Sequence, residues 1–147
     1  MSRNGSFDPA NAAKSLARKL AMQALYRWQL NEAPWQDVVN EFSGEEEMQR
    51  ADREYFRELI SGIVVDRARL DAQLAVWMDR GPEQLDPIEH AVLLIGAYEL
   101  ERRAEVPYRV VISEGVNLAR RFGATGGYKF VNAVLDRAAR TLRADEH

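Results

Sequence analysis

Three glycines, a threonine and a lysine stand close together in the stretch RFGATGGYKF, residues 121–130. Glycines followed by a lysine can form a phosphate-binding loop, in which successive backbone N–H groups wrap a phosphate. That loop follows a strand and ends in G-K-[ST], whereas here Lys129 comes two residues after Gly127 and precedes Phe130. A dinucleotide-binding fingerprint fails on the same grounds. The stretch predicts a turn between two helices, with either a purely structural role or a ligand on its exposed backbone.

No other residues assemble into a catalytic or metal-binding set. The two histidines, His90 and His147, lie far apart, and no H-E-x-x-H zinc motif is present. The chain has no cysteine, so thiol nucleophiles and thiolate metal sites are excluded. The carboxylates at 45–47 belong to a charged run, which is typical of a solvated loop. We therefore expect no catalytic residue, no bound metal, no cofactor and no enzymatic activity.

The composition limits where the protein works and what it binds. The chain has 147 residues, of which 46% are hydrophobic, which is enough for a packed core. No apolar run approaches the roughly 20 residues of a membrane span, and no apolar signal core precedes the first helix. These features, with the absence of cysteine, predict a cytoplasmic protein without a membrane partner. Because the net charge is −3, any nucleic-acid site must be a local basic patch.

The elements that would position such a site are all helical. Apolar residues recur at helical spacing and no segment alternates as a strand would, which predicts an all-α bundle of about seven helices in two small subdomains. We expect a flexible lead-in over residues 1–13, one helical domain over 14–143 and a short tail over 144–147. The expected helices cover residues 11–30, 35–42, 52–64, 70–78, 86–100, 107–122 and 127–142.

Two helix ends carry strong local signals. Asp86 suits an N-cap, Pro87 the first helical position, and Glu89 the return contact of a capping box. Gly123 is expected to end the preceding helix in the left-handed conformation. The turn after it exposes the N-terminus of the last helix, where free N–H groups and the helix dipole favour a phosphate.

Two helix faces could follow a nucleic acid. On the last helix one polar stripe holds Lys129, Asn132, Asp136, Arg140 and Arg143. On the first helix, a helical wheel places the cations Arg18 and Lys19 and the aromatic ring of Tyr26 on the outer arc. Met22 lies on the same arc. Cations hold phosphates and a ring can stack on an unpaired base, so this composition suits single-stranded RNA. An ordinary solvated face with a tyrosine at the core edge is the structural alternative.

Five segments, in order, resemble the successive motifs of the NusB family of bacterial transcription antitermination factors. They are ARKLAMQALYRWQLN, DREYFRELISGIV, DPIEHAVLLIGAYEL, VPYRVVISEGVNLARRFG and YKFVNAVLDRAAR, and together they cover residues 14–143. The resemblance implies binding of boxA, a short single-stranded element of nascent ribosomal RNA leaders. It also implies a heterodimer with NusE, a small-subunit ribosomal protein. With other Nus factors the pair would modify the RNA polymerase elongation complex so that it reads through terminators.

The resemblance also implies site residues at matching positions. The RNA site would combine the outer face of the first helix with the turn before the last helix: Lys14, Arg18, Lys19, Tyr26, Gly126, Gly127, Lys129 and Phe130. Glu89 matches an acidic position that contacts the partner. Ser15 and Leu16 stand where well-known relatives have a dense arginine run, so we expect RNA binding to depend more on NusE.

Other functions remain open at this point. A helical bundle with an exposed apolar edge could be a protein-interaction adaptor or a homodimer without RNA binding of its own. A NusB-like domain also precedes some ribosomal-RNA methyltransferases, so an accessory role in ribosomal-RNA modification is a further alternative. Gel-shift with a boxA-like RNA, with and without NusE, separates these classes.

Overall fold

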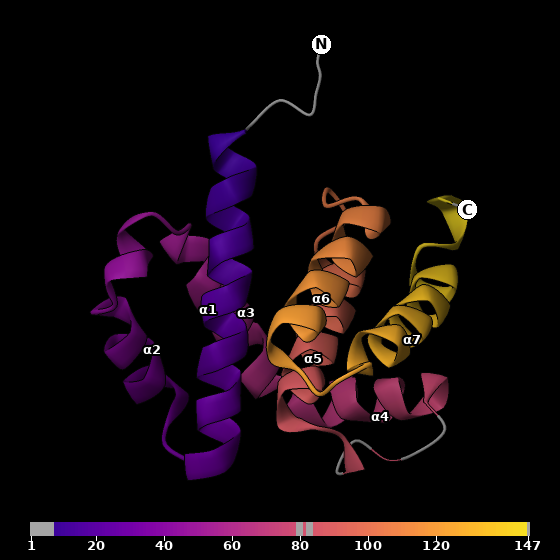
Figure 1. Cartoon of the computed structure of the whole chain (residues 1–147), viewed down its shortest axis with the longest axis horizontal. Coiled ribbons are helices and arrows are strands. Elements are labelled where there is room, and N and C mark those ends of the chain that lie inside the picture. Colours follow the sequence, from indigo (N-terminus) through magenta and orange to yellow (C-terminus); the bar gives the residue numbers. More distant parts are fainter. Residues whose placement is uncertain (1–7, 79–80, 82–83, 147) are drawn as a thin grey trace. The chain divides into compact units, whose positions relative to one another are not determined.

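A computed structural model describes residues 8–78, 81 and 84–146 of the chain (Figure 1). The described residues form α-helices and short 3-10 helices, without a strand among them, which confirms the predicted all-α class. The seven α-helices are α1 (Pro9–Asn31), α2 (Trp35–Ser43), α3 (Arg53–Val65), α4 (Arg67–Trp77), α5 (Pro87–Arg102), α6 (Tyr108–Phe122) and α7 (Gly127–Leu142). The 3-10 helices η1 and η3 cover Glu46–Gln49 and Ala144–Glu146.

The chain divides into two compact units, Met1–Ser61 and Gly62–His147. The first contains α1, α2, η1 and most of α3, and the second contains α4 to α7. This division agrees with the two small subdomains expected from the sequence. No helix among the described residues is both long and apolar enough to cross a membrane.

Helix α1 begins earlier than the sequence predicts. Asp8 caps it, because its carboxylate accepts a hydrogen bond of 2.9 Å from the Ala10 N–H, and Pro9 takes the first helical position. Residues 9 and 10, expected in the flexible lead-in and before the first helix, are therefore helical, as are residues 11–13, which the expected lead-in and the expected helix share; residues 1–7 lie outside the described part of the chain. The helix ends where Glu32 adopts a left-handed conformation with φ of 52°.

More of α1 is buried in the first unit than a single helical wheel allows. Ala17, Leu20 and Ala24 are fully buried, as the wheel predicts. Met22, which the wheel places on the outer arc, is fully buried as well. The reason is that α1 has neighbours on more than one side, since α2 and η1 both pack against it. A wheel assumes one buried face, so it fails for a helix with neighbours on several sides.

Helix α5 is the centre of the second unit and contacts α4, α6 and α7 (Figure 1). Every residue from Glu89 to Leu100 is buried. Its start follows the prediction: the Asp86 carboxylate accepts hydrogen bonds from the N–H groups of Ile88 and Glu89, at 3.1 and 3.2 Å. A continuous apolar run such as PIEHAVLLIGAYEL is typical of a helix covered on all sides.

Small residues allow α5, α6 and α7 to pack closely. A Cβ atom added to Gly96 of α5 would lie 2.6 Å from the side chain of Leu135 on α7. A Cβ added to Gly115 of α6 would lie 2.9 Å from the same leucine. One side chain of α7 therefore fits against the backbone of both α5 and α6.

Arg143 closes the second unit at the far end of α7. It is only 4% exposed, and its guanidinium donates hydrogen bonds to the carbonyl oxygens of Leu100, Glu99 and Arg103 at 2.7, 3.2 and 2.9 Å. Its predicted place on the solvent stripe of the last helix is wrong, because α7 ends at Leu142 and Arg143 is no longer helical. The arginine instead adds hydrogen bonds to carbonyls at the end of α5, where intrahelical donors run out; the Glu99 and Arg103 carbonyls also accept the N–H groups of Arg103 and Val106.

Candidate nucleic-acid interface

In the turn between α6 and α7, Gly123 and Gly126 are glycines for different structural reasons. Gly123 ends α6 in an extended conformation with ψ of −175°, so the expected left-handed cap at this residue is wrong. A Cβ at Gly123 would lie 2.8 Å from the Ala119 carbonyl oxygen, so this position requires glycine for space. The left-handed residue is Gly126, with φ of 80°, which precedes α7 and has open space around it.

Glu89 of α5 holds this turn through a hydrogen bond on its buried side. Its carboxylate accepts a hydrogen bond of 3.0 Å from the Ala124 N–H, and its side chain is 6% exposed. A Cβ added to Gly127 would lie only 1.8 Å from Glu89 Oε2, so the absent side chain makes room for the carboxylate. A carboxylate beside the start of α7 is also favoured by the helix dipole. One side of the turn is thus occupied by a protein anion, and only the outer side can meet a ligand.

The outer side of the turn carries the predicted basic residue. Lys129 is exposed in the first turn of α7, Gly126 is exposed beside it, and Phe130 is half-buried. The structure therefore brings together Gly126, Gly127, Lys129 and Phe130 at the N-terminus of one helix. Their binding to RNA stays a prediction.

Arg120 lies at the end of α6, next to this turn, and was not identified as a site residue from the sequence. It is exposed, and its guanidinium carbon lies 4.3 Å from the centre of the Tyr128 ring across the turn. Basic residues in the last turn of a helix commonly compensate the helix dipole, so ARRFG alone gave no reason to single out Arg120. The recognisable signal is the tyrosine eight positions later, in the first turn of the following helix.

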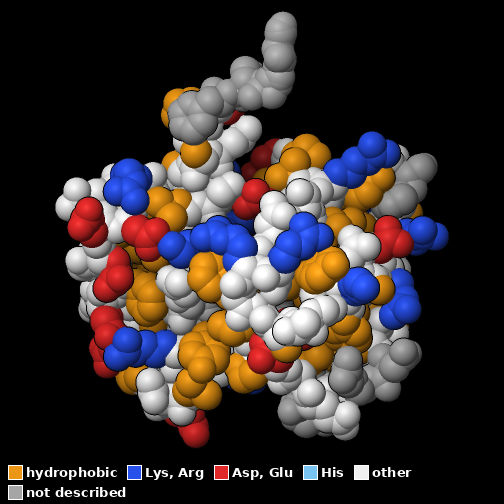
Figure 2. All heavy atoms as spheres, viewed as in Figure 1, with side chains coloured by type: hydrophobic (Ala, Val, Ile, Leu, Met, Phe, Trp, Pro, Cys, Tyr) orange, Lys and Arg blue, Asp and Glu red, His pale blue; other side chains and the backbone are white. Residues whose placement is uncertain are grey.

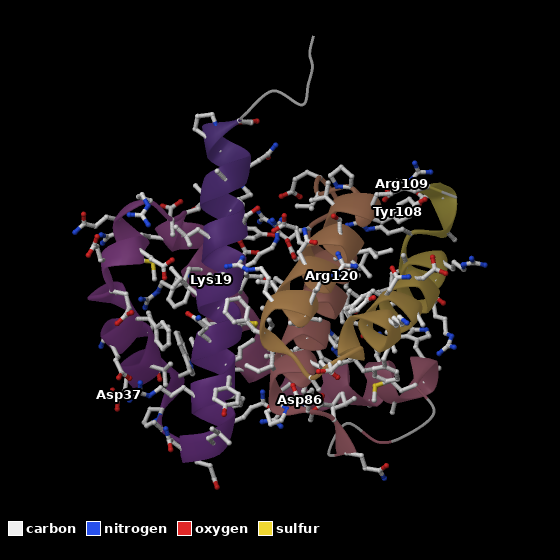
Figure 3. All side chains as sticks on the ribbon, in the orientation of Figure 1. Lys19, Asp37, Asp86, Tyr108, Arg109 and Arg120 are labelled. Carbon is white, nitrogen blue, oxygen red and sulfur yellow. The ribbon has the colours of Figure 1, made fainter. Side chains whose placement is uncertain are left out.

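Lys14 and Lys19 of α1 point to acidic neighbours within the first unit. The Lys14 ammonium lies 3.5 Å from Asp52, and the Lys19 ammonium lies 2.6 Å from Glu47 (Lys19 is labelled in Figure 3). Both lysines keep part of their side chains exposed. Each ammonium can therefore exchange a carboxylate for a phosphate, at the cost of an exposed ion pair.

The helical wheel predicts that Arg18 and Tyr26 are both exposed, and the structure agrees only for Tyr26. Tyr26 is 36% exposed, in agreement with the wheel. Arg18 is only 3% exposed, and its guanidinium carbon lies 5.5 Å from the centre of the Tyr55 ring. The expected position of Arg18 on an outer face is wrong because the start of α3 covers this part of α1. Its role in RNA binding stays a prediction, and the geometry favours an indirect role through Tyr55.

The remaining titratable candidates form no metal site among residues 8–78, 81 and 84–146. No group of three potential ligands occurs in that part of the chain. His90 is 5% exposed, and its Nε2 lies 2.6 Å from Asp71 Oδ1, so it joins α5 to α4. His147 lies outside the described residues.

Comparison with known proteins identifies the family. The NusB family model matches residues 15–140. The chain is 45% identical to the transcription antitermination protein NusB of Alcanivorax borkumensis, over 92% of this chain and 90% of that protein. It is 46% identical to the Pseudoalteromonas atlantica protein of the same name, over 92% and 96%, and 47% identical to that of Yersinia pestis, over 90% and 96%.

Solved structures share the fold. NusB of T. maritima superimposes with a TM-score of 0.76 at 24% identity, covering 86% of this chain and 89% of that one. A chain from a complex of NusB and NusE with double-stranded RNA gives a TM-score of 0.72 at 23% identity, covering 86% and 96%. The family model and the curated relatives confirm the resemblance seen in the sequence motifs, and the protein is a member of the NusB family of non-enzymatic transcription antitermination factors.

Proposed function

We propose that this protein binds boxA RNA as a heterodimer with NusE and, with other Nus factors, acts on the RNA polymerase elongation complex, in the cytoplasm. The observation that carries the RNA part is the exposed pair Gly126 and Lys129 at the start of α7. The curated relatives are named for transcription antitermination, and one solved relative is a complex of NusB and NusE with RNA. These names support the assignment of RNA and NusE as partners.

The turn before α7 suits a phosphate for a local reason. The first N–H groups of a helix lack intrahelical partners and attract anions. The absent side chain of Gly126 leaves the outer side of the turn open, since nothing lies within 4 Å of a Cβ built there. Lys129 adds a full positive charge beside it. Because Glu89 already occupies the inner side, a phosphate would approach from the Gly126 side.

Helix α1 would contribute a second set of contacts from the first unit. Lys14 and Lys19 would neutralise phosphates, and Tyr26 offers a ring for a base or ribose. Arg18 would act by holding Tyr55 in place beside Lys14, whose ammonium lies 5.4 Å from the same ring.

The partner proposal includes the start of α5 and the neighbouring turn. Glu89 holds Ala124 rather than projecting into solvent, so its influence on NusE would pass through the position of the turn. A homodimer would compete with these assemblies if it used the same surfaces.

Fluorescence anisotropy with labelled boxA RNA tests the proposal, with and without NusE. Lys129→Gln should weaken binding and reduce the slope of log affinity against log salt by about 0.7, the value for one phosphate on a single strand. Arg102→Gln is the matched control, because Arg102 is an exposed cation at the opposite end of α5 from Glu89. If the parent protein binds NusE and no RNA under any of these conditions, the protein-adaptor alternative is correct.

A further inference from the structure

A groove of about 490 Å³ lies on the surface of the second unit, between α6 and α7. Its lining includes the apolar residues Ile112 and Val116 of α6. Figure 2 shows Lys and Arg side chains at intervals over the α6–α7 region, with hydrophobic surface between them. None of the residues proposed to contact boxA, at the turn before α7 or on α1, lines this groove.

At each end of the groove an arginine guanidinium lies close to a tyrosine ring. At the start of α6, Arg109 Nε donates a 3.2 Å hydrogen bond to the Tyr108 hydroxyl, and its guanidinium carbon lies 5.7 Å from the ring centre. Near the end of α6, Arg120 lies over Tyr128. Figure 3 shows Arg109 and Arg120 well apart along α6, and eleven residues of helix correspond to about 16 Å. Several consecutive nucleotides of one strand span this distance.

The charges between the two arginines do not oppose an anion. Asn117 and Asn132 are exposed, neutral and able both to donate and to accept hydrogen bonds. Asp136 is the acidic residue of the lining, and its carboxylate lies 3.1 Å from Arg140, which balances its charge. The groove therefore keeps the two positive charges of Arg109 and Arg120.

The groove also continues the proposed contact at the turn. Lys129 and Asn132 are three residues apart on α7, so they lie on one face of that helix. Cations that hold phosphates, rings and arginine planes that stack, and amides that meet base edges together fit single-stranded RNA. An acidic peptide would pair with the arginines and the amides, but it would gain nothing from arginine planes that can stack on bases.

We propose that the α6–α7 groove, named here by Arg109, Asn117, Arg120 and Asn132, binds nucleotides that flank boxA on the same RNA strand. This rests on the proposed function, because the flanking strand is brought to the groove by boxA bound at the turn. The groove would extend the length of RNA recognised without requiring a particular flanking sequence, since stacking and phosphate contacts are tolerant of sequence.

The test compares boxA RNA alone with boxA carrying an unstructured extension on its 5′ side or on its 3′ side, all measured with NusE present. One extension should raise the affinity of the parent protein roughly fivefold or more, the gain expected from one stacked base. Arg109→Gln should abolish that gain and leave the affinity for boxA alone unchanged. Arg121→Gln is the control, because Arg121 is an exposed arginine of α6, stacks on Phe122, and does not line the groove.

The outcomes separate this inference from the proposed function. If boxA alone does not bind, the proposed function fails and the inference fails with it. If boxA alone binds but neither extension adds affinity, or Arg109→Gln keeps the gain, only the inference is overturned. If Arg109→Gln weakens NusE binding in the absence of RNA, the groove is a protein interface and the inference is likewise wrong. Circular dichroism and an unchanged affinity for boxA alone show that the variant is folded.

Discussion

At the scale of single residues, the turn before α7 depends on one carboxylate. Glu89 is bound to Ala124 thirty-five positions along the chain, and the space it occupies is the space a side chain at Gly127 would need. Gly126 and Gly127 are neighbours in sequence, yet they are glycines for different reasons. Gly126 requires a positive φ, whereas Gly127 requires the absence of Cβ.

Alanine substitutions distinguish these two reasons. Gly126→Ala should lower the free energy of unfolding by about 1–2 kcal/mol, because a residue with Cβ is strained in the left-handed region. Gly127→Ala should cost about 1–3 kcal/mol through overpacking against the Glu89 carboxylate. Adding Glu89→Ala should recover part of the loss for Gly127→Ala and none for Gly126→Ala. Urea denaturation of these four variants and of Glu89→Ala alone measures both effects, and equal rescue of both glycine variants would contradict the assignment.

Lys19 and Glu47 allow a test in which two substitutions have opposite signs. Their ammonium and carboxylate lie 2.6 Å apart in a partly exposed pair, so in the proposed site Glu47 would compete with a phosphate for Lys19. Lys19→Gln should weaken boxA binding and lower the salt slope by about 0.7. Glu47→Gln should strengthen binding by up to about fivefold, the equivalent of an exposed ion pair. Salt titrations by anisotropy give both numbers, and weaker binding by Glu47→Gln would show that Lys19 faces no phosphate.

At the scale of helices, Arg69 of α4 binds Glu101 of α5 and also Asp66, the residue before α4. Its guanidinium donates hydrogen bonds to both oxygens of Glu101, at 2.8 and 2.6 Å, and also to Asp66. The hydrogen bond from Arg69 is the main cause that lowers the pKa of Glu101 and of Asp66 below their ordinary values. Arg102 lowers both pKa values further through its charge.

The lowered pKa values predict how stability depends on pH. A carboxyl whose pKa is lower in the folded state stabilises the fold above its unfolded-state pKa of about 4, and this contribution is lost as the pH falls through the folded value. Arg69→Gln should therefore flatten the fall in the urea midpoint between about pH 5 and pH 3. Arg140→Gln, which removes an exposed arginine of α7 outside this cluster, should leave the pH dependence as in the parent. Identical pH profiles for the parent and Arg69→Gln would rule out this linkage.

The helices also show what the sequence could predict and where tertiary neighbours decide. Periodicity and caps predict the seven helices, and Asp86 is found as the cap it was expected to be. Arg18 was misplaced because its environment is set by Tyr55, which no local pattern links to α1. The contact between Glu89 and Ala124 was missed for the same reason. Residues at the free end of a helix, such as Lys129, need no such information and were placed correctly on the surface.

At the scale of the whole molecule, an acidic protein is expected to bind an acidic polymer. The net charge is −3, so attraction at long range is weak and binding must come from local contacts. The charges of Lys14 and Lys19 are already partly balanced by Asp52 and Glu47. Stacking by an aromatic ring adds affinity that does not depend on charge, which gives Tyr26 more weight here than in a basic relative.

Tyr26→Ala should therefore weaken boxA binding by about 1–3 kcal/mol, with NusE present, and leave the salt slope unchanged. Leu30→Ala is the matched control, because Leu30 lies one turn further along α1 and is 57% exposed. That substitution removes apolar surface from the same helix without removing a ring. Equal losses for the two variants would mean that α1 contributes apolar contact area only, and an altered slope for Tyr26→Ala would mean that the ring positions a cation.

Because Arg143 is synthesised late, the second unit can complete its packing only late in translation. The carbonyl oxygens at the end of α5 receive this donor from a residue forty-three positions after Leu100. During translation, α5 is thus made long before the group that completes its C-terminal end leaves the ribosome. The first unit, Met1–Ser61, is synthesised before any of these residues. On a ribosome paused between α6 and α7, the central apolar helix α5 would therefore lack both Arg143 at its C-terminus and the packing of α7. A nascent chain with such an uncovered apolar helix is a substrate for chaperones.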